Sequence, residues 1–137
     1  MRIGLTVLAA VAAAIVLPAS AQADSSPFIS PSGNIACQID AGGAVCDISD
    51  HTYQPPPPPP CAEHFPWGSR FVLEAGKAAT VVCHSDSLRV PGEPPLDYGQ
   101  TKSAGTFTCD SEFSGMKCTD SSTGHYFRVS RESFDLG

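Results

Sequence analysis

Two stretches of this sequence share one design: Cys37-Gln38-Ile39-Asp40-Ala41-Gly42-Gly43-Ala44-Val45-Cys46 and Cys109-Asp110-Ser111-Glu112-Phe113-Ser114-Gly115-Met116-Lys117-Cys118. Each holds eight residues between two cysteines and has an acid-x-x-Gly block at its centre. A type I turn favours an acidic residue at its first position and glycine at its last. Each stretch therefore predicts a β-hairpin that begins and ends at a cysteine.

With the turn at the centre, the flanks of each hairpin pair symmetrically. Cys37 then faces Cys46, and Cys109 faces Cys118. Directly opposed residues that exchange no hydrogen bonds bring their Cβ atoms close to the separation that a disulfide requires. We therefore expect one disulfide inside each hairpin.

The remaining cysteines, Cys61 and Cys83, are expected to pair by elimination. They flank a third predicted hairpin with strands over Arg70–Ala75 and Ala78–Cys83 and a turn at Gly76-Lys77. An even cysteine count in a short exported chain favours disulfides, and no two cysteines have the short gap typical of zinc ligands. The six cysteines are thus interpreted as architecture, and we predict no metal and no cofactor.

The first 23 residues have the layout of a cleavable secretory signal. Arg2 precedes an apolar run over residues 3–17, and small residues follow up to Ala23. This run of about 15 residues is shorter than the roughly 20 that a membrane-spanning helix needs. We expect cleavage after Ala21 or Ala23, no membrane span afterwards, and one secreted domain over residues 24–137 that is extracellular or kept in the cell envelope.

The sequence of the rest of the chain predicts short strands and turns. Short β-prone runs such as Phe71–Ala75 and Tyr126–Val129 are separated by Gly, Pro and Ser, without a sustained helical period. The sequence predicts an all-β domain, a small disulfide-stapled antiparallel sandwich or barrel built from short hairpins. The run Pro55–Pro60 predicts a polyproline II strut, and Pro91–Pro95 predicts a surface loop.

The charge of the secreted part limits its partners. Without Arg2 it has seven basic and fourteen acidic residues, a formal net charge of 7 − 14 = −7. Such a surface has no basic stripe that would bind phosphate backbones or anionic lipid headgroups. We therefore expect no nucleic acid and no membrane partner, but a monomer that binds a protein or an envelope component.

The sequence contains few groups suited to catalysis. It has no Gly-x-Ser-x-Gly elbow, no leftover cysteine and no phosphate-binding glycine loop. His84 and Asp86, two residues apart, could act as a base and its orienter, but a solvated pair at a strand end is the simpler interpretation. We predict no catalytic residue and no enzyme.

Two loops combine aromatic residues with glycine, as recognition loops often do. They contain Tyr98 and Gly99 in one case and His125 and Tyr126 in the other. These four residues are the candidate recognition residues, and the alternative is that aromatic side chains such as Tyr98 are core residues beside turn glycines.

Several short stretches form a combination that extends from about residue 28 to residue 136. They are Ser30-Pro31-Ser32-Gly33-Asn34-Ile35-Ala36-Cys37, Val45-Cys46-Asp47-Ile48, Trp67-Gly68, Tyr98-Gly99-Gln100-Thr101, Phe107-Thr108-Cys109 and Ser122-Thr123-Gly124-His125-Tyr126-Phe127. The combination resembles a family of small secreted, six-cysteine actinobacterial proteins of mycobacterial type and unknown function. The resemblance implies a secreted or envelope location and transfers no catalytic or binding residue; Tyr126 stands where the family has glycine.

The leading hypothesis is a secreted, non-catalytic interaction module that binds through loops on a stapled β scaffold. A secreted inhibitor of a hydrolase is a second hypothesis, in which the proline strut or the Pro91–Pro95 loop would enter a cleft. A small hydrolase based on carboxylates, or on His84 with Asp86, is the third.

Overall fold

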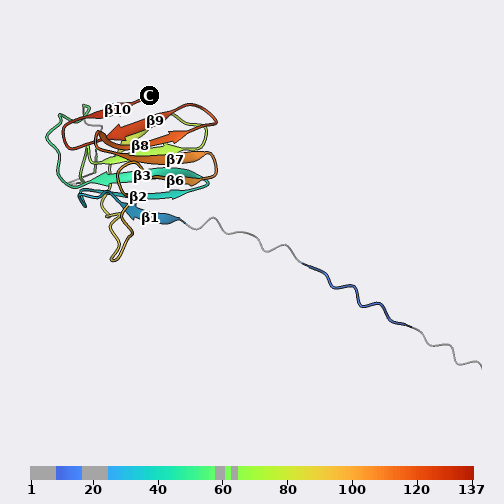
Figure 1. Cartoon of the computed structure of the whole chain (residues 1–137). Helices are drawn as coiled ribbons and strands as arrows, with labels where there is room; N and C mark the ends of the chain where they lie inside the picture. The colour runs from blue at the N-terminus through green and yellow to red at the C-terminus, as the bar shows by residue number, and fades with distance from the viewer. Residues whose placement is uncertain (1–8, 17–24, 58–60, 63–64) are drawn as a thin grey trace, which may run out of the picture.

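The computed structural model describes residues 9–16, 25–57, 61–62 and 65–137, and the strands in these residues form two antiparallel five-stranded sheets (Figure 1). The first sheet has the order β1 (Ser26–Ile29), β2 (Ile35–Asp40), β3 (Gly43–Ile48), β4 (Arg70–Glu74), β5 (Thr80–Val82). The second has the order β10 (Phe134–Leu136), β9 (Tyr126–Val129), β8 (Gly115–Asp120), β7 (Phe107–Glu112), β6 (Thr101–Ala104). The sheets do not close on each other, so the expected all-β domain is a sandwich rather than a barrel.

The core lies between the sheets because inward and outward side chains alternate along each strand. In β7, for example, Phe107, Cys109 and Ser111 are buried while the residues between them are partly exposed. Phe71 and Phe127, from opposite sheets, lie with their ring centroids 5.8 Å apart. The two sheets therefore share a single core.

The two short hairpins have the register that their sequences predict. Cys37 pairs with Cys46 and Cys109 with Cys118, and each pair forms a disulfide with Cα atoms 4.1 and 4.0 Å apart. All four residues are fully buried. The Sγ of Cys46 lies 3.9 Å from the Sγ of Cys118, so the two disulfides touch across the interface between the sheets.

The third disulfide joins Cys61 to Cys83, as expected by elimination, with Cα atoms 5.9 Å apart. Both cysteines are partly exposed. The hairpin beside this bond is shorter than predicted, because β4 ends at Glu74 and β5 covers only Thr80–Val82.

The described part of the proline run is fixed to the segment before β4. The indole Nε1–H of Trp67 donates to the carbonyl of Pro56 at 2.9 Å, and the hydroxyl of Tyr53 donates to the carbonyl of Gly68. A side chain at Gly68 would collide with the ring of Pro55. Residues 58–60 of the expected strut lie outside the described residues.

The expected signal segment lies only partly within the structure. Residues 1–8 and 17–24 fall outside the described residues, and residues 9–16 are exposed and form no strand or helix. No helix in the described residues is long and apolar enough to cross a membrane.

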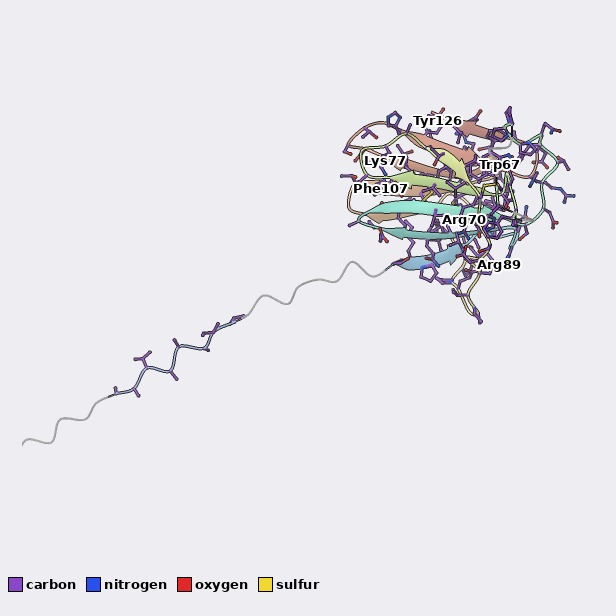
Figure 2. The ribbon with its side chains drawn as sticks, turned by 180° about the vertical axis from the view of Figure 1, so that it is seen from behind. Trp67, Arg70, Lys77, Arg89, Phe107 and Tyr126 are labelled. Atoms are coloured by element: carbon purple, nitrogen blue, oxygen red, sulfur yellow. A yellow bond between two sulfur atoms is a disulfide. The ribbon has the colours of Figure 1, made fainter. Side chains whose placement is uncertain are left out.

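The sandwich has two ends, each made of turns from both sheets. At the Ala41 end, the β2–β3 turn at Ala41 lies against Gly105 of the β6–β7 turn. At the Ser30 end lie the β1–β2 turn, the β7–β8 turn and the segments that follow β3 and β9. Figure 2 shows Arg89 at the Ser30 end and Lys77 and Phe107 toward the other.

Candidate functional site

A pocket of about 400 Å³ opens at the Ser30 end of the sandwich. The β1–β2 turn and the segment after β3 line it from the first sheet, and the β7–β8 turn and the segment after β9 line it from the second. Arg89 and Tyr98 contribute from the long connection between β5 and β6. Residues from both sheets are therefore needed to form this pocket, which we call the end pocket.

Ser111 and Met116, a cross-strand pair of β7 and β8, both line the end pocket. Both are about 1% exposed. The Ser111 hydroxyl has no hydrogen-bond partner among the described residues. By contrast, the hydroxyl of Ser30 accepts the N–H of Ile35 at 3.0 Å and contacts the hydroxyl of Ser32. Ser111 is thus the buried pocket residue whose side chain has no hydrogen-bond partner among the described residues.

An aromatic pair forms part of the pocket wall. The rings of Tyr98 and Phe113 are stacked, with centroids 4.2 Å apart and an interplanar angle of 26°. The loop that carries Tyr98 is tied to β7, because Gly99 N–H donates to the Ser111 carbonyl at 2.7 Å and Ser111 N–H donates to the Gln100 carbonyl at 3.0 Å. Phe113 lies in the β7–β8 turn and is 89% exposed.

Side-chain bonds fix the opposite wall. Asn34 and Asp50 bond reciprocally: the Asn34 amide donates to the Asp50 carbonyl at 2.9 Å, and Asp50 N–H donates to Asn34 Oδ1 at 2.8 Å. Arg89 donates to the hydroxyl of Ser49 at 2.6 Å and to the carbonyl of Gly33. These contacts hold the β1–β2 turn against the segment after β3.

The charges around the end pocket are mixed. Its charged lining residues are Asp50, Arg89, Glu112, Arg131 and Glu132. Among the described residues no side chain makes a hydrogen bond or ion pair with the side chain of Arg131 or Glu132, although the Arg131 carbonyl accepts from Thr52. The acids exceed the bases by one, so the site has no excess of positive charge.

The structure separates the four candidate recognition residues. Tyr98 lines the end pocket, and Gly99 supports it through its bond to Ser111. His125 and Tyr126 belong to the Ala41 end, because Tyr126 pairs with Thr119 at the far end of β8 from the pocket. The ring of Tyr126 lies 4.6 Å below the Lys117 Nζ.

Sequence reasoning did not identify Ser111 or Phe113 as pocket residues. Ser111 follows Phe107 and Cys109 at a spacing of two in a predicted strand, so it is a polar residue in an inward position. Phe113 is a large apolar residue at the centre of a predicted turn, where solvent exposure is expected. Both signals were present in the sequence, but no local pattern links them to Ser30 or Arg89.

His84 and Asp86 lie in a separate polar cluster. One ring nitrogen of His84, Nε2, is 2.9 Å from the Ser69 hydroxyl, and the other, Nδ1, is 2.7 Å from the main-chain carbonyl of Asp86. The Asp86 carboxylate instead accepts from Arg70 at 2.8 Å, and this hydrogen bond lowers the pKa of Asp86. Arg70 also makes a two-point ion pair with the buried Asp47. The Asp86 carboxylate is therefore a partner of Arg70 and not the orienter of His84.

Neither His84 nor Asp86 lines the end pocket. In the part of the chain that the structure describes, no group of three or more His, Cys, Asp or Glu side chains is placed to hold a metal ion.

A family model, described as a family of unknown function (DUF6636), matches residues 6–136, and the chain belongs to this family. No curated protein and no solved structure matches the chain significantly.

Proposed function

We propose that this member of DUF6636 is an exported, non-catalytic binding module that holds a polar ligand in the end pocket. The observation that carries the proposal is Ser111, a pocket-lining residue whose buried hydroxyl has no partner among the described residues. A buried hydroxyl without a hydrogen bond costs roughly 1–3 kcal/mol. A ligand group that met this hydroxyl after a rotation of the Ser111 side chain toward the pocket would recover this free energy.

The site is suited to binding because its walls are already fixed. The Cys109–Cys118 disulfide closes the hairpin that carries Ser111 and Phe113, and the Asn34–Asp50 bonds hold the opposite wall. A preorganised site loses little conformational entropy when its ligand binds. The scaffold therefore favours recognition by a rigid surface.

Export is the second part of the proposal. It is supported by the signal-like layout of residues 1–23 and by the resemblance to secreted six-cysteine proteins of actinobacteria. Three disulfides are compatible with an extracellular or envelope location, because oxidising compartments preserve them.

A non-catalytic role is supported by the composition of the pocket. The described lining residues include serines and acids but no histidine or lysine that could activate a serine hydroxyl. Among the described residues, the Ser–His hydrogen bond between Ser69 and His84 lies outside the pocket.

The test is a titration of the ¹⁵N-labelled, oxidised secreted domain with a soluble extract of the cell envelope, followed by amide chemical shifts. We expect shifts at Ser111, Phe113, Asn34 and their neighbours. Ser111→Val should weaken binding about tenfold or more, which corresponds to about 1.4 kcal/mol. Ser103→Val, on the exposed edge strand β6 and away from the pocket, is the matched control.

Absence of any shift, or shifts confined to the Ala41 end, would contradict the proposal. So would equal binding by the Ser111 and Ser103 variants.

One observation favours a hydrolase inhibitor as the second candidate. Phe113, 89% exposed at the tip of a disulfide-closed hairpin, is a rigid apolar projection of the kind that can enter a cleft. This hairpin is neither of the two loops that the sequence suggested for such a role. Inhibition of a secreted hydrolase by the wild type and not by Phe113→Ala would favour this candidate over the binding module.

A further inference from the structure

We propose that the ligand of the end pocket is a β-1,4-linked glycan of all-equatorial pyranose sugars, namely the glycan strand of peptidoglycan, and that one of its rings stacks on Phe113. This inference rests on the proposed function, because it assigns the ligand of the same site.

Phe113 is exposed and yet held in place. One face of its ring stacks on Tyr98, whose loop is anchored to β7 by the Gly99–Ser111 hydrogen bond. Because Phe113 is 89% exposed, much of the remaining ring surface faces solvent. An exposed aromatic ring that is held in one orientation can serve as a binding platform. Its flat surface fits a ligand that itself has a flat apolar face.

The rest of the pocket is rich in hydroxyl groups. Ser30, Ser32, Ser49, Ser111 and Ser130 line it. The hydroxyls of Ser30, Ser49 and Ser130 each already make a hydrogen bond within the protein, whereas that of Ser111 has no partner among the described residues. Because a serine hydroxyl has one donor and two acceptor positions, the bonded hydroxyls keep part of their capacity and can meet the hydroxyl groups of a sugar. An apolar platform beside hydroxyl-rich walls is the complement of a pyranose ring, which has C–H groups on its faces and hydroxyls at its edge.

The charged residues of the pocket lining disfavour phosphate-containing ligands of similar size. Arg89 is already bonded to Ser49 and Gly33, and three carboxylates share the pocket lining with two guanidinium groups. Phosphate and nucleotide ligands require excess positive charge or amide donors. Arg131, without a side-chain partner among the described residues, is available for a single carboxylate such as the lactyl group of an N-acetylmuramic acid unit.

The shape of the platform selects the sugar stereochemistry. A pyranose with every substituent equatorial presents axial C–H groups on both faces, whereas an axial hydroxyl would interrupt contact with an aromatic ring. β-1,4-linked N-acetylglucosamine and N-acetylmuramic acid have this all-equatorial form. An envelope polymer built from them therefore fits the platform better than a mannose polymer does.

The experiment measures binding of the oxidised secreted domain to insoluble, purified peptidoglycan by co-sedimentation and to chitohexaose by NMR titration. A soluble α-mannan is the control glycan. Phe113→Ala should weaken both interactions about tenfold or more, and Phe113→Tyr should keep them. Phe65→Ala, a substitution at another exposed phenylalanine that does not line the pocket, should leave binding unchanged.

An amide spectrum with native dispersion shows that each variant is folded, and Phe113 lies in an exposed turn where truncation removes no core contact. Equal binding of mannan and chitohexaose, or wild-type binding by Phe113→Ala, would overturn the inference. If envelope extract shifts the pocket residues but peptidoglycan and chitohexaose do not, the glycan assignment is wrong and the binding module stands. If neither produces shifts, both proposals are wrong.

Discussion

Ser111 is a polar residue in a position that the strand pattern reserves for the core. Because its buried hydroxyl is unpartnered, Ser111→Ala should raise the free energy of unfolding, by up to about 1 kcal/mol, while it weakens ligand binding. Chemical denaturation of the ligand-free protein measures the first effect. Ser30→Ala is the matched control and should destabilise by about 1 kcal/mol, because that hydroxyl accepts the Ile35 N–H. Equal losses in the two variants would refute the role given to Ser111.

Gly115 is the residue in the β7–β8 hairpin that tolerates no side chain. Its φ is 130°, and a Cβ there would collide with the carbonyl oxygen of Val129 in β9. Gly115→Ala should therefore cost about 2 kcal/mol or more.

The comparison for this glycine is Gly76→Ala. Gly76 also has a positive φ, of 73°, but nothing lies within 4 Å of the added Cβ, so only the backbone strain of about 1 kcal/mol remains. Thermal unfolding of both variants separates the cost of the collision from the cost of the backbone strain. Similar melting temperatures would mean that small backbone shifts remove the collision at residue 115.

At the scale of elements, the stapled hairpins differ in what their disulfides do. The chain-entropy model assigns roughly 2.7 kcal/mol to a ten-residue loop and about 3.4 kcal/mol to the longer Cys61–Cys83 loop. However, Cys37 and Cys46 are fully buried and contact the other core disulfide, whereas Cys61 and Cys83 are partly exposed. Removing a core disulfide therefore also leaves a cavity.

The double substitution Cys37→Ala/Cys46→Ala should thus destabilise the domain more than Cys61→Ala/Cys83→Ala, against the order that loop length alone predicts. Guanidinium denaturation under non-reducing conditions measures both. A larger loss from the Cys61–Cys83 removal would show that loop entropy outweighs core packing here.

Some elements depend on distant contacts. The strand β10 was not predicted, because its three residues carry too short a pattern. It forms where Phe134 packs against Tyr53 and Phe71, with ring centroids 5.1 and 5.7 Å apart. The hairpins, by contrast, were predictable because turn residues, alternation and cysteines all act within ten residues of one another.

At the scale of the whole molecule, acid stability depends on Asp120, a fully buried carboxylate at the Ala41 end. Hydrogen bonds from Ser122 and Thr106 lower its pKa below the ordinary value of 3.8. A carboxyl group whose pKa is lower in the folded state stabilises the protein above its unfolded pKa, and this contribution is lost as the pH falls through the folded pKa.

Asp120→Asn should therefore lower stability at pH 7 and have a shrinking effect below about pH 4. Asp110→Asn has the opposite sign, because burial raises the pKa of Asp110 and its charged form disfavours folding at neutral pH. Urea denaturation of both variants at several pH values between about 2 and 7, a range that spans the titration of carboxyl groups, measures whether each substitution raises or lowers the free energy of unfolding. A pH-independent effect of Asp120→Asn would contradict the linkage.

The sequence alone was enough to predict the all-β class, the two acid-x-x-Gly hairpins and the pairing of their cysteines, because turn chemistry and strand alternation act over a few residues. It also pointed to Tyr98. The sandwich arrangement and the gathering of Ser30, Arg89 and Ser111 around one pocket depend instead on the packing of the two sheets. These residues lie on both sheets and a long connection, and they meet because the strand order brings distant turns to the same end of the molecule. No local sequence pattern predicts that these residues lie together, because their proximity results from how the two sheets pack.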